Sequence, residues 1–179
     1  FPAADLELIR QPLDFFGINL YWGDRVRLGE DGQTALLPHP QQTDWTAFDW
    51  PMLPACMYWG PRFFHERYGL PIVVTENGVS GRDWVALDGK VHDPYRVDYV
   101  ARHLLALRRA AEEGVPLGGY FHWSVLDNFE WSDGYRHRFG LIHVDYDSGR
   151  RRIKDSGYWY RDVIRSHGAS LAQLIEGGA

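Results

Sequence analysis

Short apolar runs alternate with amphipathic segments along this chain. Three runs of apolar residues, rich in β-branched or aromatic side chains, predict strands over residues 14–21, 72–75 and 117–123. Three segments with helical spacing of large apolar side chains predict helices over residues 57–68, 97–113 and 154–167. In chain order this is a βα series, which predicts parallel strands covered by helices.

Glycine and an Asp-Pro pair mark the ends of the predicted helices. Gly69 ends the first helix, the pair Asp93-Pro94 is expected to cap the second, and Gly114 ends it. The polar segment 22–54 is longer than the usual connection of about 4–6 residues, so we expect it to be functional or to pass over a neighbouring part.

Near the C-terminus the pattern predicts finer features. A short hairpin is expected around residues 139–146, and Arg150-Arg151-Arg152 is expected to be a solvated turn after Asp147-Ser148-Gly149. The Gly-containing tail, residues 168–179, is expected to be flexible.

Composition excludes several classes of protein. The 179 residues are 45% hydrophobic and 24% charged, which is an ordinary globular balance. No run approaches the roughly 20 apolar residues that cross a bilayer, and residues 1–5 lack a signal pattern, so no membrane partner is expected. The missing initiator Met indicates a cut or processed start.

Charge and cysteine content narrow the picture further. The formal charge of −5, with dispersed Lys and Arg, offers no basic stripe for phosphates, so no nucleic-acid partner is expected. Cys56 is the single cysteine and cannot form an internal disulfide, which fits a reducing compartment. We therefore expect a cytoplasmic protein.

Aromatic residues are unusually frequent, at 15%, with eight Trp and ten Tyr. Their flat apolar faces and polar handles suit sugar rings, although core packing could also use many of them.

Candidate chemistry lies where two predicted strands end. Glu76 follows the strand 72–75 and precedes Asn77-Gly78, and the strand 117–123 opens into residues 124–131, rich in aromatics, amides and carboxylates. The carboxyl ends of parallel strands meet at one edge, so a shared active-site face is expected. By itself, Glu76 could equally be a helix-cap or salt-bridge residue.

Four stretches together resemble glycoside hydrolase family 1, the β-glucosidase and β-galactosidase family. They are Asp14-Phe-Phe-Gly-Ile-Asn-Leu-Tyr21, Val74-Thr-Glu-Asn-Gly78, Phe121-His-Trp-Ser-Val-Leu-Asp-Asn-Phe-Glu-Trp131 and Gly134-Tyr-Arg-His-Arg-Phe-Gly-Leu141. The resemblance runs from about residue 13 to 163.

The resemblance implies an α/β fold that is the C-terminal part of a (β/α)8 TIM barrel, strands six to eight with their helices. Residues 1–179 would then be one segment of a single barrel domain. Three strands do not close a barrel, which needs about 250 residues, so two open parallel edges and association with a missing portion are expected. A small open α/β domain is the alternative.

It also implies a retaining β-glycosidase in which Glu76 is the nucleophile and forms a covalent glycosyl-enzyme. Tyr21 would donate a hydrogen bond to Glu76, and Asn19 would be a polar residue near it. A nucleophilic carboxylate must stay ionised, which favours such donors over an apolar pocket.

Four further residues match sugar contacts of the family. Glu130 and Trp131 would bind sugar hydroxyls, Trp123 would lie under the glycone ring, and Phe139 would close the pocket around the 6-hydroxymethyl group. For the three aromatic residues core packing is the alternative, and Phe139 is closest to it. An anionic Glu130 would repel a phosphorylated sugar, which favours a non-phosphorylated glycone.

No metal or other cofactor is expected. His122 fits a hydrogen-bonded core histidine without a second histidine at ligand spacing, and Asp127 and Asn128 are expected to fix their loop. The resemblance leaves the choice among glucose, galactose and fucose open.

The family's general acid/base lies on a strand-four motif, Asn-Glu-Pro, outside this chain. The expected partners are therefore a β-glucoside or cello-oligosaccharide substrate and the N-terminal portion of the same barrel. The alternative is a non-catalytic fragment that binds sugar or associates with itself. Adding an N-terminal half restores turnover only under the first hypothesis.

Overall fold

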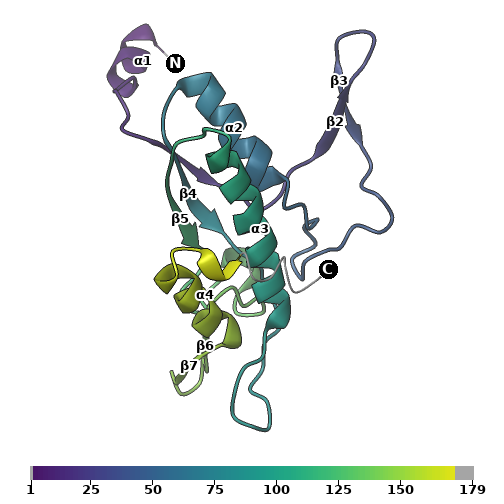
Figure 1. Cartoon of the computed structure of the whole chain (residues 1–179), viewed down its shortest axis with the longest axis vertical. Coiled ribbons are helices and arrows are strands. Elements are labelled where there is room, and N and C mark those ends of the chain that lie inside the picture. Colours follow the sequence, from purple (N-terminus) through teal and green to yellow (C-terminus); the bar gives the residue numbers. More distant parts are fainter. Residues whose placement is uncertain (1, 172–179) are drawn as a thin grey trace.

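The computed structural model describes residues 2–171 of the chain. Its centre is a parallel sheet in the order β1 (Phe16–Asn19), β4 (Ile72–Asn77) and β5 (Leu117–His122) (Figure 1). The three predicted parallel strands are therefore confirmed, although β1 is shorter than the apolar run 14–21. Strand β4 is longer than predicted and continues through Glu76 and Asn77, so the candidate nucleophile lies within the central strand.

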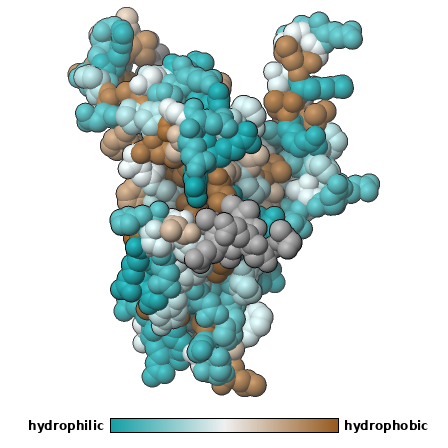
Figure 2. Space-filling model, viewed as in Figure 1, coloured by the Kyte–Doolittle hydropathy of each residue, from teal (hydrophilic) through white to brown (hydrophobic). Residues whose placement is uncertain are grey.

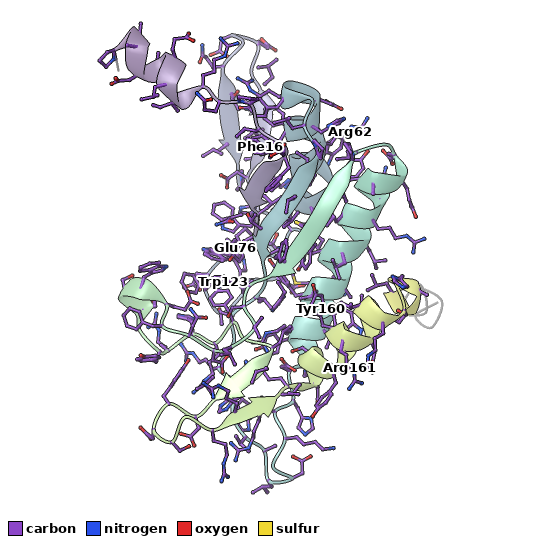
Figure 3. The ribbon with its side chains drawn as sticks, turned by 90° about the vertical axis from the view of Figure 1, so that its left-hand side faces the viewer. Phe16, Arg62, Glu76, Trp123, Tyr160 and Arg161 are labelled. Atoms are coloured by element: carbon purple, nitrogen blue, oxygen red, sulfur yellow. The ribbon has the colours of Figure 1, made fainter. Side chains whose placement is uncertain are left out.

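Three helices confirm the predicted ones, with shifted ends. They are α2 (Cys56–Tyr68), α3 (Pro94–Glu112) and α4 (Asp155–Arg165). Helix α2 ends as predicted at Gly69, whose φ of 68° is a left-handed conformation that glycine adopts without steric cost. Helix α2 packs on α3 and α3 on α4. Figure 3 shows them on one side of the sheet.

The main core lies between the sheet and helices α2 and α3. Its buried members come from both layers: Ile18, Met57, Tyr58, Ile72, Val74, Leu107, Ala110 and Val115. Alternate positions of the strands point to the other face of the sheet, where Asn19, Thr75 and Phe121 are exposed.

Both edges of the sheet are open within the described part of the chain. Strands β1 and β5 pair with β4 on one side only. The expectation of two open parallel edges is confirmed, and natural sheets normally pair or cover such edges.

The segment 22–54 is not simply a polar loop. It contains an antiparallel hairpin of β2 (Arg25–Leu28) and β3 (Thr34–Leu37), which stands away from the body of the molecule (Figures 1 and 2). The prediction was wrong here because each strand has four residues, too few for a clear alternation. A short helix, α1 (Ala3–Ile9), was also missed, and it buries no residue.

The predicted hairpin near the C-terminus has a different second arm. Strand β6 (Ile142–Val144) pairs with β7 (Arg151–Ile153), and Gly149 makes the turn with φ of 69°. Arg151 and Arg152 therefore lie in a strand rather than in a solvated turn. The pairing of β6 decides this, because a basic run alone gives no strand signal.

Asp93 is the N-cap residue of α3 and Pro94 lies in its first turn, as predicted, but the Asp93 side chain makes no capping hydrogen bond. Its carboxylate accepts instead from the backbone N–H and hydroxyl of Ser156, and it pairs with Arg96. This carboxylate belongs to a buried ionic cluster with Asp83, Arg96, Asp127 and Lys154. The cluster ties the start of α3 to the start of α4.

Leu171 is buried and packs with Ala101 and Val163. The flexibility of residues 168–179 stays a prediction, and residues 172–179 lie outside the described residues. Among the helices of residues 2–171, none is long and apolar enough to cross a membrane.

Candidate active site

The Glu76 carboxylate lies at the carboxyl end of the central strand and is bonded to a neighbouring tyrosine. Tyr21 Oη donates a hydrogen bond to Glu76 Oε2 over 2.7 Å, which confirms the predicted contact. The pKa of Tyr21 is raised, mainly by burial and then by the hydrogen bond to Glu76. The phenol therefore stays protonated and acts as a donor to the carboxylate.

Backbone around Glu76 is fixed by Asn77, which is fully buried. Its amide nitrogen donates to the carbonyl of Leu20 over 2.8 Å, and its amide oxygen accepts from Tyr120 over 2.8 Å. One side chain of β4 thus bonds both β5 and the residue that follows β1, beside the candidate nucleophile. Sequence reasoning missed this role, and an amide at the end of an apolar strand was the available signal.

The ends of β4 and β5 approach each other closely at residue 78, which explains why a glycine lies there. A Cβ at this position would lie 2.0 Å from the carbonyl oxygen of Trp123, which is far inside van der Waals contact. Any side chain at residue 78 would separate the end of β4 from the end of β5. Glu76 and Trp123 consequently lie near the same end of the sheet (Figure 3).

Asn19 lies on β1 opposite Glu76 in the strand register. Its amide oxygen accepts from the Thr75 hydroxyl over 2.7 Å, on the exposed side of the sheet. The structure thus places Asn19 next to Glu76, as predicted, while its contact with a substrate stays a prediction.

Glu130 forms a second carboxylate site. Its Oε1 accepts from the indole N–H of Trp123 over 3.2 Å and from the amide of Asn128 over 2.8 Å. Burial is the main cause that raises the pKa of Glu130, the charges of Glu76 and Asp133 add to it, and the two hydrogen bonds oppose it. Within residues 2–171, Oε2 has no hydrogen bond and is available to a ligand hydroxyl.

The aromatic candidates differ in exposure. Trp131 is 83% exposed, so core packing does not explain it, whereas Phe139 is 2% exposed. Phe139 packs against Tyr21, Phe48 and Trp50, with ring centroids 5.7–6.4 Å apart. This burial favours the core-packing alternative for Phe139, and its contact with a sugar stays a prediction.

Sequence reasoning also missed Phe48 and Trp50, which it left in a polar loop. The Trp50 ring lies 5.0 Å from that of Tyr21 and is half-buried. Two aromatic residues within a polar segment were the available signal, because such side chains seek an apolar neighbour.

Asp127 fixes the loop that carries Glu130, as predicted. Its carboxylate accepts from Arg138, Lys154 and the backbone N–H of Gly140. Asn128 bonds both Ser124 and Glu130, so the loop between Trp123 and Glu130 is held at two successive residues.

Burial shifts the pKa values of His122 and Cys56. His122 contacts the carbonyl of Phe139, and burial lowers its pKa to about 3. Burial also raises the pKa of the Cys56 thiol to about 12. Residues 2–171 contain no group of three or more His, Cys, Asp or Glu side chains that could hold a metal ion.

The sequence model of glycosyl hydrolase family 1 matches residues 1–169. This chain belongs to glycosyl hydrolase family 1. Family members with similar sequences include beta-glucosidase A of Thermotoga maritima, 42% identical over 165 residues, with 92% of this chain and 37% of that protein covered. The bifunctional beta-D-glucosidase/beta-D-fucosidase of Bifidobacterium breve is 42% identical over 184 residues, with 93% of this chain and 40% of that protein covered.

Solved structures of the family agree with this fold. The Thermotoga maritima beta-glucosidase in complex with castanospermine superposes with a TM-score of 0.83 at 41% identity, with 92% of this chain and 37% of that chain covered. The chain therefore spans 37–40% of the length of these relatives, and its fold corresponds to part of a family 1 barrel.

Proposed function

We propose that this chain is the C-terminal portion, strands six to eight, of a family 1 TIM barrel that acts as a retaining β-glucosidase. The hydrogen bond between Tyr21 and Glu76 at the carboxyl end of the central strand is the observation that carries this proposal. Active sites of such barrels lie at the carboxyl ends of the strands. The identity to family 1 β-glucosidases supports the same reaction.

In the proposed mechanism, one carboxylate oxygen of Glu76 attacks the anomeric carbon of a terminal β-D-glucosyl residue. The bond from that carbon to the aglycone oxygen breaks, and an acid outside this chain donates a proton to the leaving oxygen. The same group, now a base, then takes a proton from water, which attacks the glycosyl-enzyme and releases Glu76. Two inversions give net retention. Tyr21 holds the attacking carboxylate in position.

We assign the glycone pocket to Glu130, Trp123, Trp131 and Asn19. Glu130 Oε2 would accept from sugar hydroxyls, while Trp123 would present its ring and hold Oε1 through its N–H. An ionised Glu130 favours a non-phosphorylated glycone. Glucose is the proposed substrate sugar, with fucose or galactose also accepted, and a cello-oligosaccharide is the proposed natural substrate.

The proposed partner is the N-terminal portion of the same barrel, which carries the acid/base. Strands β1 and β5 offer it two open parallel edges. The same edges also favour a second candidate, a fragment that binds sugar or associates with another copy without catalysis.

Mass and product stereochemistry test the proposal together. Intact mass under native and denaturing conditions shows whether a further polypeptide segment accompanies these residues. Hydrolysis of an aryl β-glucoside is then followed by proton NMR, and the β-anomer of glucose should appear first. First appearance of the α-anomer would contradict a glycosyl-enzyme mechanism, and absence of turnover in the complete assembly would favour the second candidate.

Replacing Glu130 by Gln should mainly weaken substrate binding. A hydrogen bond that involves a charged group is worth about 1.5–3 kcal/mol, so kcat/KM should fall about 10- to 100-fold, with most of the loss in KM. Steady-state kinetics with an aryl β-glucoside measure this. Glu112→Gln, on the exposed side of α3, is the control and should be neutral. A loss confined to kcat would show that Glu130 acts on the reacting bond.

A further inference from the structure

A second cavity lies beside the start of α3 and has a volume of about 860 Å³. It is lined by residues from three segments: residues 44–47 with Met52, residues 79–84, and residues 92, 94, 95, 98 and 99. None of the residues that we assign to the active site lines it. Its volume lies within the range of about 300–1,000 Å³ that is typical of small-molecule sites.

Three aromatic side chains reach the surface around this cavity. Trp45 is 55% exposed, Trp84 is 74% exposed and Tyr95 is 41% exposed. An indole ring this exposed to water forgoes most of the stabilisation that burial of its apolar surface would give. Their gathering around one cavity is thus unexplained by packing within the chain.

Backbone and side-chain contacts hold the segments around Trp45 and Tyr95 and the start of the segment that carries Trp84. Trp45 pairs with Pro51 through a β-bridge, and the backbones of Gly81 and Arg138 exchange two hydrogen bonds. Tyr95 bonds Asp83, and Arg96 donates to the Tyr95 hydroxyl over 2.8 Å. The Tyr95 ring and the backbone at Trp45 are therefore pre-organised, which reduces the entropy lost on binding.

A polar group within the lining needs a partner. The Ser80 hydroxyl is buried, with the residue 2% exposed, and it has no hydrogen-bond partner among the described residues. Leaving a buried hydroxyl unpaired is unfavourable, so a ligand hydroxyl here would be favoured. Around it, the carboxylates of Asp44 and Asp98 and the guanidinium of Arg82 can exchange hydrogen bonds with hydroxyls as well.

We propose that this cavity is a second carbohydrate-binding site, which takes a short gluco-oligosaccharide. A sugar ring has an apolar C–H face for an indole and a rim of hydroxyls that both donate and accept, which matches the lining. An apolar peptide would leave the carboxylates and Ser80 unpaired. An anion would meet the carboxylates of Asp44, Asp83 and Asp98 against the Arg82 guanidinium and the His92 imidazole. The site does not depend on the proposed hydrolysis at Glu76.

Fluorine NMR of the whole protein, with the full length that it has in nature, tests this site. Tryptophan is replaced biosynthetically by 5-fluorotryptophan, and the signals of Trp45, Trp84, Trp59 and Trp123 are assigned from their Trp→Phe variants. Cellotetraose is titrated into a Glu76→Gln background so that it is not cleaved. Trp59, 63% exposed on α2 and away from this cavity, is the matched control.

The signals of Trp45 and Trp84 should shift with one common affinity, and Trp59 should not. Trp84→Ala should weaken the affinity seen at Trp45 by roughly 2- to 12-fold, because loss of one aromatic contact is worth about 0.5–1.5 kcal/mol. Shifts at Trp123 alone would overturn the second site and leave the active site standing. Shifts at Trp45 and Trp84 without Trp123 would support the second site while the proposed function fails. No shift at Trp45 and Trp84 overturns the inference.

Discussion

Replacing Glu76 by Gln should lower kcat for an aryl β-glucoside by on the order of 10⁴-fold or more. The amide keeps the size and the neighbours of the carboxylate but cannot attack the anomeric carbon. The hydrogen bond from Tyr21 Oη can still be accepted by the amide oxygen, so the fold and the glycone pocket should persist. Steady-state kinetics, with circular dichroism to confirm folding, measure the effect.

Glu66→Gln is the matched control. Glu66 is an exposed helical carboxylate that pairs with Arg62 at i and i+4, and such surface pairs contribute about 0.3–0.5 kcal/mol. Its substitution should leave kcat unchanged. A slow substrate with fluorine at C2 should label the unaltered protein, and peptide mass mapping should find the sugar on Glu76. A label on another carboxylate, or substantial turnover by Glu76→Gln, would remove Glu76 from the nucleophile role.

The parallel sheet could be predicted from the sequence because each of its strands has a local apolar pattern. Ile72-Val73-Val74 is a β-branched run between a helix stop and a glycine, and the structure places it in the centre of the sheet. The Tyr21–Glu76 contact was also predictable, because the resemblance names both residues and neighbouring parallel strands bring them together.

Other features depend on contacts that no local pattern records. Asp93 precedes Pro94 as a cap should, yet Ser156 and Arg96 offer its carboxylate buried partners from across the fold. Phe139 lies in a motif that implies a sugar contact, but aromatic residues from the segment 22–54 cover it. In both cases a tertiary neighbour, distant along the chain, favours one of two local interpretations.

Lys154→Met should lower the free energy of unfolding more than either carboxylate substitution at the active site. The Lys154 side chain is fully buried, and its ammonium pairs with Asp83 and Asp127, which are 2% and 0% exposed at the side chain. Methionine keeps the length but leaves two buried carboxylates with one fewer cation. Removing one partner of a buried pair costs about 3–5 kcal/mol, and because Arg96 and Arg138 remain, we expect about 3 kcal/mol. Urea unfolding measures it.

Lys90→Met, at an exposed position, is the control and should change the free energy of unfolding by less than about 0.5 kcal/mol. A double-mutant cycle separates charge from packing: Lys154→Met combined with Asp83→Asn should cost less than the sum of the two single changes, because the second change removes a carboxylate that the first left unpaired. Simple additivity would mean that Lys154 acts through packing.

The ionic cluster also reaches the active site, because Asp127 belongs to the loop between Trp123 and Glu130. If Lys154 orders that loop through Asp127, then Lys154→Met should raise KM for the glucoside even in buffers where the protein is fully folded. An unchanged KM, together with a lower free energy of unfolding, would confine the ionic cluster to holding α3, α4 and the β6–β7 hairpin together.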